Sequence, residues 1–102
     1  MNTDFGGRDT PLIWASWHGW MDVVVLLLRR GARVNDPSRR GVTALMAAAW
    51  NSPSSEVITV LLRAGADANL KDREGKIALD YAEMNGKVKG TDAYLELKKA
   101  TF

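Results

Sequence analysis

The amino-acid sequence predicts an all-α repeat solenoid, because the same markers return along the chain at a nearly constant spacing. A Thr-x-Leu triplet begins at Thr10, recurs at Thr43 and reappears in altered form at Ile77, at intervals of 33 and then 34 residues. A Gly-Ala-x-x-Asn segment starts at Gly31 and again, 34 residues later, at Gly65. In both copies, a six-residue run rich in Val, Leu and Ile ends shortly before the glycine. Several markers in one register indicate internal repetition.

The first unit has the pattern of two short helices joined by a turn. Pro11 suits the first turn of a helix, where its missing N–H would be unpaired anyway, and Thr10 before it can cap that helix. We expect this helix to end just before Gly19. A second helix is expected over roughly 21–30 and should stop at Gly31, a residue type that readily adopts a positive φ after a helix.

The later units repeat this design with small changes. In the second unit, Ser52 and Pro53 have the pattern of a cap followed by proline at the first helical position. The extra residue of this unit falls in the loop between its two helices. In the third unit, Thr91 is expected to cap a final helix. The positive charges of Lys98 and Lys99 near its end interact favourably with the helix dipole.

A unit of this size cannot bury its own apolar face, so we expect the units to stack in a row. Small residues in the first helices indicate a close approach between neighbours: Ala15, Ala47, Ala48, Ala49 and Ala82. The prediction is one domain over residues 1–102, divided into repeats of about 8–37, 38–71 and 72–102.

These segments resemble the ankyrin repeat, whose pattern begins Gly-x-Thr-Pro-Leu-His-x-Ala and ends Leu-Leu-x-x-Gly-Ala-Asp-x-Asn. The openings match at 10–15, 41–48 and 75–82, and the endings match at 27–32 and 61–69. The resemblance covers nearly the whole chain. It implies helix-turn-helix units joined by projecting β-turn or hairpin loops. It also implies a non-catalytic module for protein–protein interaction.

Some positions depart from the family pattern. The histidine after Thr-Pro-Leu is replaced by Ile13, Met46 and Asp80 in the three units. The third unit is lysine-rich and resembles a C-terminal capping repeat, whereas the first unit is strongly apolar. We therefore expect further repeats upstream in the natural protein, and the alternative is a genuine three-repeat protein.

Composition limits the other functional classes. The chain has 102 residues, of which 46% are hydrophobic and 25% charged, and it has no cysteine, which removes disulfides and thiolate metal sites. A net charge of +2 is too small to imply nucleic-acid binding by itself. The longest apolar run is far shorter than the roughly 20 residues of a membrane span. No signal peptide is visible, so we expect a soluble monomer, cytoplasmic by default, that binds neither nucleic acid nor membrane.

No residue pattern in the chain indicates catalysis, a metal site or a cofactor. His18 is the single histidine, and we expect it at the surface beside Gly19. Asp80 and Glu83 are three residues apart and can share a helix face, but a solvated face is the simpler interpretation. No Gly-rich phosphate-binding loop is present.

The resemblance instead implies a binding groove made of turn tips and the ends of the first helices. Trp17, Trp50 and Met84 occupy equivalent positions, so stacking should place them in a row. Trp and Arg are the residue types most enriched at binding hot spots. The full set of candidate partner-binding residues is Trp17, His18, Arg39, Arg40, Val42, Trp50, Asn51, Arg73, Glu74, Lys76, Met84 and Asn85.

Structural roles compete with this interpretation. We expect Trp14 in the core and Trp20 against the next repeat, while Trp17 and Trp50 either anchor a partner or cover the stack. The arginines of the tips can equally be solvated turn residues. Two other identities stay open: an electrostatic nucleic-acid-binding module and an engineered repeat scaffold. Unequal repeat lengths and the eroded third unit favour a natural sequence over an engineered one.

Overall fold

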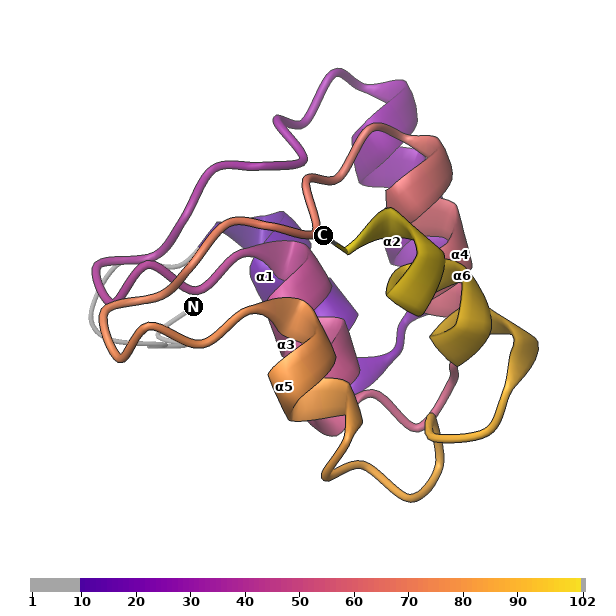
Figure 1. Ribbon diagram of the computed structural model, residues 1–102. Helices are drawn as coiled ribbons and strands as arrows, with labels where there is room; N and C mark the ends of the chain where they lie inside the picture. Colours follow the sequence, from indigo (N-terminus) through magenta and orange to yellow (C-terminus); the bar gives the residue numbers. More distant parts are fainter. Residues whose placement is uncertain (1–9, 102) are drawn as a thin grey trace.

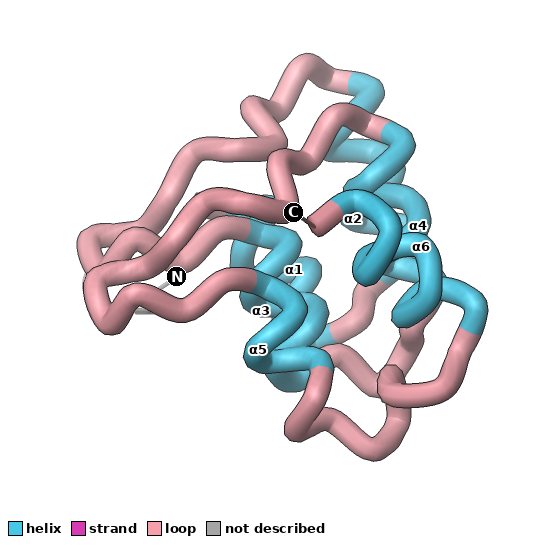
Figure 2. The backbone as a smooth tube through the Cα atoms, in the orientation of Figure 1, coloured by secondary structure: helices cyan, strands magenta, loops and turns pink. Residues whose placement is uncertain are grey.

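The computed structural model describes residues 10–101, which form two layers of helices (Figure 1). One layer contains α1, α3 and α5, and the other contains α2, α4 and α6. The loops that join one repeat to the next project together to one side of the first layer (Figure 2). The six helices are α1 (Pro11–His18), α2 (Met21–Arg29), α3 (Ala44–Asn51), α4 (Glu56–Arg63), α5 (Ala78–Ala82) and α6 (Asp92–Ala100). With no strand among the described residues, the all-α repeat solenoid is confirmed.

Threonine side chains begin three of the helices. The hydroxyls of Thr10, Thr43 and Thr91 each accept a hydrogen bond from the backbone N–H three residues further along, at 3.2, 3.3 and 3.2 Å. Each bond satisfies one of the N–H groups that a helix leaves unpaired at its start. The third repeat has Ile77 at this position, and the carboxylate of Asp80 accepts from the Ile77 backbone N–H instead, at 3.0 Å. The caps expected at Thr10 and Thr91 are confirmed.

Gly19 ends α1 in the way that the sequence predicts. Its φ of +73° is in the left-handed region that favours glycine. A Cβ at this position would also lie only 2.8 Å from Cδ of Pro53, in the loop of the next repeat. Glycine is therefore needed here both for the backbone conformation and for the close approach of the following unit.

The helix start predicted at Ser52 and Pro53 is wrong. Ser52 instead ends α3, and its backbone N–H donates to the carbonyl of Ala48 at 3.0 Å. Its hydroxyl accepts from the Ser54 N–H at 3.1 Å and donates to the Ser54 carbonyl at 2.9 Å, so the side chain stabilises a local turn. α4 begins only at Glu56, and the extra residue of this repeat does fall in the inter-helix loop.

The core runs through the stacked helices without interruption between repeats. The alanines singled out in the sequence are fully buried where the first helices meet. Larger apolar side chains from both layers belong to the same buried cluster as these alanines. The fully buried side chains of most volume include Leu12, Ile13, Leu45, Met46, Ile58, Leu61 and Leu97.

Asparagine side chains in the loops after α2 and α4 join each of these two repeats to the next one. The amide of Asn35 donates to the carbonyl of Gly65 at 3.2 Å, and its oxygen accepts from the Asp67 N–H at 2.8 Å. Asn69, one repeat later, donates to the carbonyl of Ala100 at 3.4 Å. The asparagine that marks the repeat in the sequence is therefore a link between repeats.

None of the helices in the described range 10–101 has both the length and the apolar character needed to cross a membrane.

Candidate functional site

The two tryptophans at the ends of the first helices lie next to each other. Trp17 in the last turn of α1 and Trp50 in the last turn of α3 have ring centroids 5.1 Å apart, with their planes at 79°. Edge-to-face contact of this kind is a preferred geometry for aromatic pairs. The structure therefore places this pair as the register of the repeats requires.

The row continues through a residue that the sequence analysis missed. Tyr81 of α5 also contacts Trp50, in a stacked arrangement with centroids 4.7 Å apart and planes at 16°. Met84, expected as the third member of the row, is exposed beyond the end of α5. Tyr81 precedes Met84 by three residues, a spacing that puts two side chains on one helix face. This spacing is the feature of the sequence from which Tyr81 could have been predicted as a member of the row.

Tyr81 also connects the aromatic row to a loop tip. Its hydroxyl donates to the carboxylate of Asp72, which in turn accepts from the backbone N–H groups of Glu74 at 2.8 Å and Lys76 at 2.9 Å. The ammonium of Lys76 lies 5.7 Å from the centre of the Tyr81 ring. The third-repeat tip is thus held against α5 by charge-assisted hydrogen bonds.

These contacts shift both ionisable groups away from their ordinary pKa. Burial and the Asp72 carboxylate raise the pKa of Tyr81 above its usual 10.0. Burial alone would raise the pKa of Asp72, but the hydrogen bonds from Tyr81 and from the backbone of Lys76 and Glu74 outweigh it and lower that pKa.

The raised pKa of Tyr81 predicts a loss of stability at alkaline pH. Above about pH 10 the unfolded chain ionises this tyrosine while the folded chain keeps it protonated, so the free energy of unfolding should fall as the pH rises further. The fall should be smaller in Tyr81→Phe, which has no hydroxyl to titrate. Urea unfolding at pH 8 and at about pH 11 measures the difference. Equal losses in both proteins would contradict this assignment.

The loop tips carry most of the candidate charges. Arg39, Arg40, Arg73 and Glu74 are exposed, and the Arg73 N–H donates to the carbonyl of Arg40 at 2.9 Å, which joins successive tips. Within residues 10–101, none of the three arginines forms an ion pair, whereas Lys76 pairs with Glu74 at 3.4 Å.

Val42 is not part of the exposed tip, so the exposure on which its assignment as a binding residue rested is wrong. Its side chain is 3% exposed and belongs to the core. Its N–H donates to the hydroxyl of Ser38 at 3.2 Å, and its carbonyl accepts from the Ser38 N–H at 2.9 Å. This tight turn brings the chain back toward α3 at Val42, so the apolar side chain is buried.

His18, Trp14 and Trp20 form a separate aromatic cluster within the first repeat. The imidazole stacks on Trp20 at 4.6 Å and lies edge-on to Trp14 at 4.3 Å. His18 is therefore half-buried rather than at the surface, and its Nε2 is buried without a hydrogen-bond partner. Trp14 is half-buried outside the core, so the expectation of a core residue is wrong. Trp20 is exposed, and its ring contacts Trp14 and His18 of its own repeat.

The candidate asparagines use their amides to hold the repeats together. Asn51 donates to the carbonyl of Trp17 at 3.1 Å. Asn85 donates to the carbonyls of Ala49 at 3.1 Å and Ser52 at 3.4 Å. Sequence reasoning placed both at the binding surface because of their register. In the structure their donors fix the position of each helix end on the preceding repeat.

The carboxylates with possible catalytic spacing have structural partners. Asp80 is bound to the Ile77 N–H, and Glu83 accepts a hydrogen bond from the Tyr94 hydroxyl and pairs with Lys89 at 3.5 Å. Within residues 10–101, no group of three or more His, Asp or Glu side chains is arranged to hold a metal ion. Both carboxylates therefore take part in structural contacts within the third repeat.

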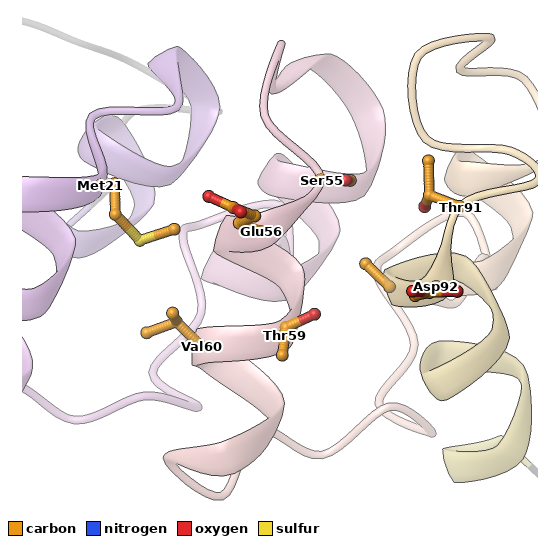
Figure 3. Close-up of a pocket in the computed structure, with 8 residues that line it drawn as sticks. Met21, Ser55, Glu56, Thr59, Val60, Thr91 and Asp92 are labelled. Carbon is orange, nitrogen blue, oxygen red and sulfur yellow. The ribbon is translucent and has the colours of Figure 1, made fainter.

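A shallow hollow of about 560 Å³ lies on the layer formed by α2, α4 and α6 (Figure 3). Met21 and Val60 form its apolar side, while Glu56 and Asp92 contribute carboxylates from the first turns of α4 and α6. Acidic residues at these positions stabilise the helix dipole. The hollow therefore adds no group whose position calls for a ligand.

Comparison with known proteins agrees with the repeat architecture. The chain matches the family described as "Ankyrin repeats (many copies)" over residues 26–82 and the family described as "Ankyrin repeat" over residues 8–39. Two rice proteins (Oryza sativa subsp. japonica) are similar over 44 residues: "Probable E3 ubiquitin-protein ligase XBOS32" at 48% identity and "Probable E3 ubiquitin-protein ligase XBOS33" at 50%. Each alignment covers 43% of this chain but only 9% and 8% of the rice proteins. The similarity is thus to a small part of much longer proteins.

Proposed function

Because the chain belongs to the ankyrin repeat family, whose members are generally protein–protein interaction modules, we propose that it is a non-catalytic module that binds a partner protein through the aromatic row and the loop tips. The aromatic row consists of Trp17, Trp50 and Tyr81. The tips contribute Arg39, Arg40 and Arg73. Ligase activity is not part of the proposal, since the similarity to the rice proteins is confined to 44 residues.

The observation that carries this proposal is that Trp50 is held by two aromatic neighbours and is still exposed. Its indole contacts Trp17 in an edge-to-face pair and stacks on Tyr81, yet the residue as a whole is 43% exposed. A large side chain that is already fixed loses little conformational freedom on binding, which favours affinity. Tryptophan is also among the residues most enriched at hot spots.

The charges of the tips define the chemistry of the partner. Three exposed arginines without ion pairs in the described range attract acidic side chains and leave the aromatic row for apolar contact. The partner proposed here therefore presents an apolar ridge beside acidic residues. The arginines should contribute more to the association rate and to its salt dependence than to the final affinity.

Trp50→Ala should weaken partner capture by about tenfold or more, the effect of losing at least 1.4 kcal/mol at a hot spot. Trp20→Ala is the matched control, because Trp20 is 46% exposed but lies outside the aromatic row. Proteins from a native extract that bind the wild type and Trp20→Ala but are lost with Trp50→Ala would be candidate partners, to be checked by titration. Equal binding to all three folded proteins, with unchanged helical circular dichroism, would overturn the proposal.

A further inference from the structure

Two successive loop tips are hydrogen-bonded to each other at Arg40 and Arg73. The Arg73 N–H donates to the carbonyl of Arg40 at 2.9 Å, and the Arg40 N–H donates to the hydroxyl of Ser38 at 3.3 Å. Gly41 allows this close approach, because a Cβ there would lie 3.1 Å from Cα of Asp72. Its φ of +81° is also in the left-handed region that favours glycine. The backbone that carries the exposed arginines is therefore held in place from both sides.

The acidic groups of these two tips do not neutralise the arginines. The buried carboxylate of Asp72 accepts the three hydrogen bonds described above, and Glu74 pairs with Lys76 at 3.4 Å. In the part of the chain that the structure describes, the three exposed arginines of the tips form no ion pair. They are called the tip arginines below: Arg39, Arg40 and Arg73.

Neither a helix dipole nor an open end of the stack accounts for the tip arginines. Arg29 and Arg63 are also exposed and, among residues 10–101, without an ion pair, but each lies in the last turn of a helix, where its charge interacts favourably with the dipole. The tip arginines lie in no helix. Arg39 and Arg40 stay exposed although the third repeat already stacks on theirs, so a neighbouring repeat does not cover this edge (Figure 2).

We propose that the tip arginines bind a phosphate monoester on a phosphorylated side chain of the partner protein. This assignment rests on the protein-binding function proposed above and specifies the acidic group that the partner presents. One guanidinium can hold a carboxylate by two hydrogen bonds. A phosphate monoester has three acceptor oxygens and a charge of about −1.5 to −2, so it can accept from guanidiniums of both tips at once. Three guanidiniums on two joined tips therefore fit a phosphate better than a single carboxylate.

The aromatic row gives this phosphate site an apolar neighbour. Tyr81 is hydrogen-bonded to Asp72, the residue before Arg73, and it stacks on the exposed Trp50. A segment whose phosphate lies on the tip arginines can therefore place a nearby apolar side chain on Trp50. We expect a preference for apolar residues close to the phosphorylated one.

Binding of peptide libraries tests the phosphate directly. Each library has random residues around one fixed central residue, which is phosphoserine, phosphotyrosine, serine or glutamate. The immobilised chain should retain at least one phosphorylated library about tenfold or more above the serine and glutamate libraries, as measured by mass spectrometry. The library that is retained identifies the side chain that carries the phosphate. Retention of neither phosphorylated library above serine, or equal retention of glutamate, would overturn the proposal.

Paired substitutions separate the tips from a general effect of charge. Arg40→Gln/Arg73→Gln should lower retention of the phosphorylated library about tenfold or more. Arg29→Gln/Arg63→Gln removes the same charge from two helix ends and should leave retention unchanged. Arg40→Lys/Arg73→Lys keeps the charge but loses the planar guanidinium, so it should restore only part of the retention. Equal losses in the two glutamine variants, with unchanged helical circular dichroism, would contradict a phosphate site at the tips.

Dephosphorylation separates this site from the protein-binding function itself. Proteins whose capture from a native extract depends on Trp50 should be lost when the extract is first treated with a protein phosphatase. If their capture persists after that treatment, the protein-binding function stands and the phosphate site is wrong. If nuclease removes the captured material and phosphatase does not, the bound phosphate belongs to a nucleic acid, and the proposal is again wrong.

Discussion

Leu45→Ala is expected to lower the free energy of unfolding by about 3 kcal/mol, within the range of about 2–5 kcal/mol measured for buried leucines. Leu45 is 1% exposed and lies in α3, the first-layer helix of the middle repeat. The substitution removes buried apolar atoms and leaves a cavity next to both neighbouring repeats. Because a domain of this size has only about 5–15 kcal/mol of net stability, the loss is a large share of it.

Leu95→Ala is the matched control for this experiment. It makes the same chemical change in α6, but Leu95 is 51% exposed, so little burial is lost and alanine favours the helix. We expect a change of about 0.5 kcal/mol or less in either direction. Urea unfolding followed by circular dichroism measures both variants, and similar losses for Leu45→Ala and Leu95→Ala would contradict the assignment of the core.

The fold could be predicted from the sequence because each repeat contains its own copy of the same residue pattern. The repeated register places the helices, the capping threonines of α1 and α3 and the glycines after α2 and α4 without reference to tertiary contacts. The contact between Trp17 and Trp50 follows from the same register. Stacking at a constant spacing turns residues one repeat apart in sequence into spatial neighbours.

The wrong or missed assignments concern residues whose hydrogen bonds are not encoded in the repeat pattern. Ser-Pro is a common helix start, but here Ser52 forms a turn with Ser54, so α4 begins later. Val42 lies beside exposed tip residues in the sequence, yet its bonds to Ser38 bring it into the core. The role of Tyr81 depends on Asp72, nine residues away, and no periodic marker links the two.

Asp72→Ala is expected to destabilise the fold by about 3 kcal/mol, because it removes three hydrogen bonds to one buried carboxylate. The buried hydroxyl of Tyr81 would be left without its acceptor, a cost of about 1–3 kcal/mol by itself. The N–H groups of Glu74 and Lys76 would lose their partner as well. Since Tyr81 stacks on Trp50, the variant should also change tryptophan fluorescence in the folded state.

Asp72→Ser separates the two roles of this carboxylate. Ser38 is the equivalent residue of the preceding repeat, and its hydroxyl accepts from the N–H groups of Arg40 and Val42 at 3.3 and 3.2 Å. A serine at position 72 should therefore keep the turn but lose the bond to Tyr81, giving roughly half the effect of alanine. Combining Asp72→Ala with Tyr81→Phe should cost less than the sum of the two single changes, because both break the same bond. Additive losses in urea unfolding would show that Asp72 stabilises the tip without the tyrosine.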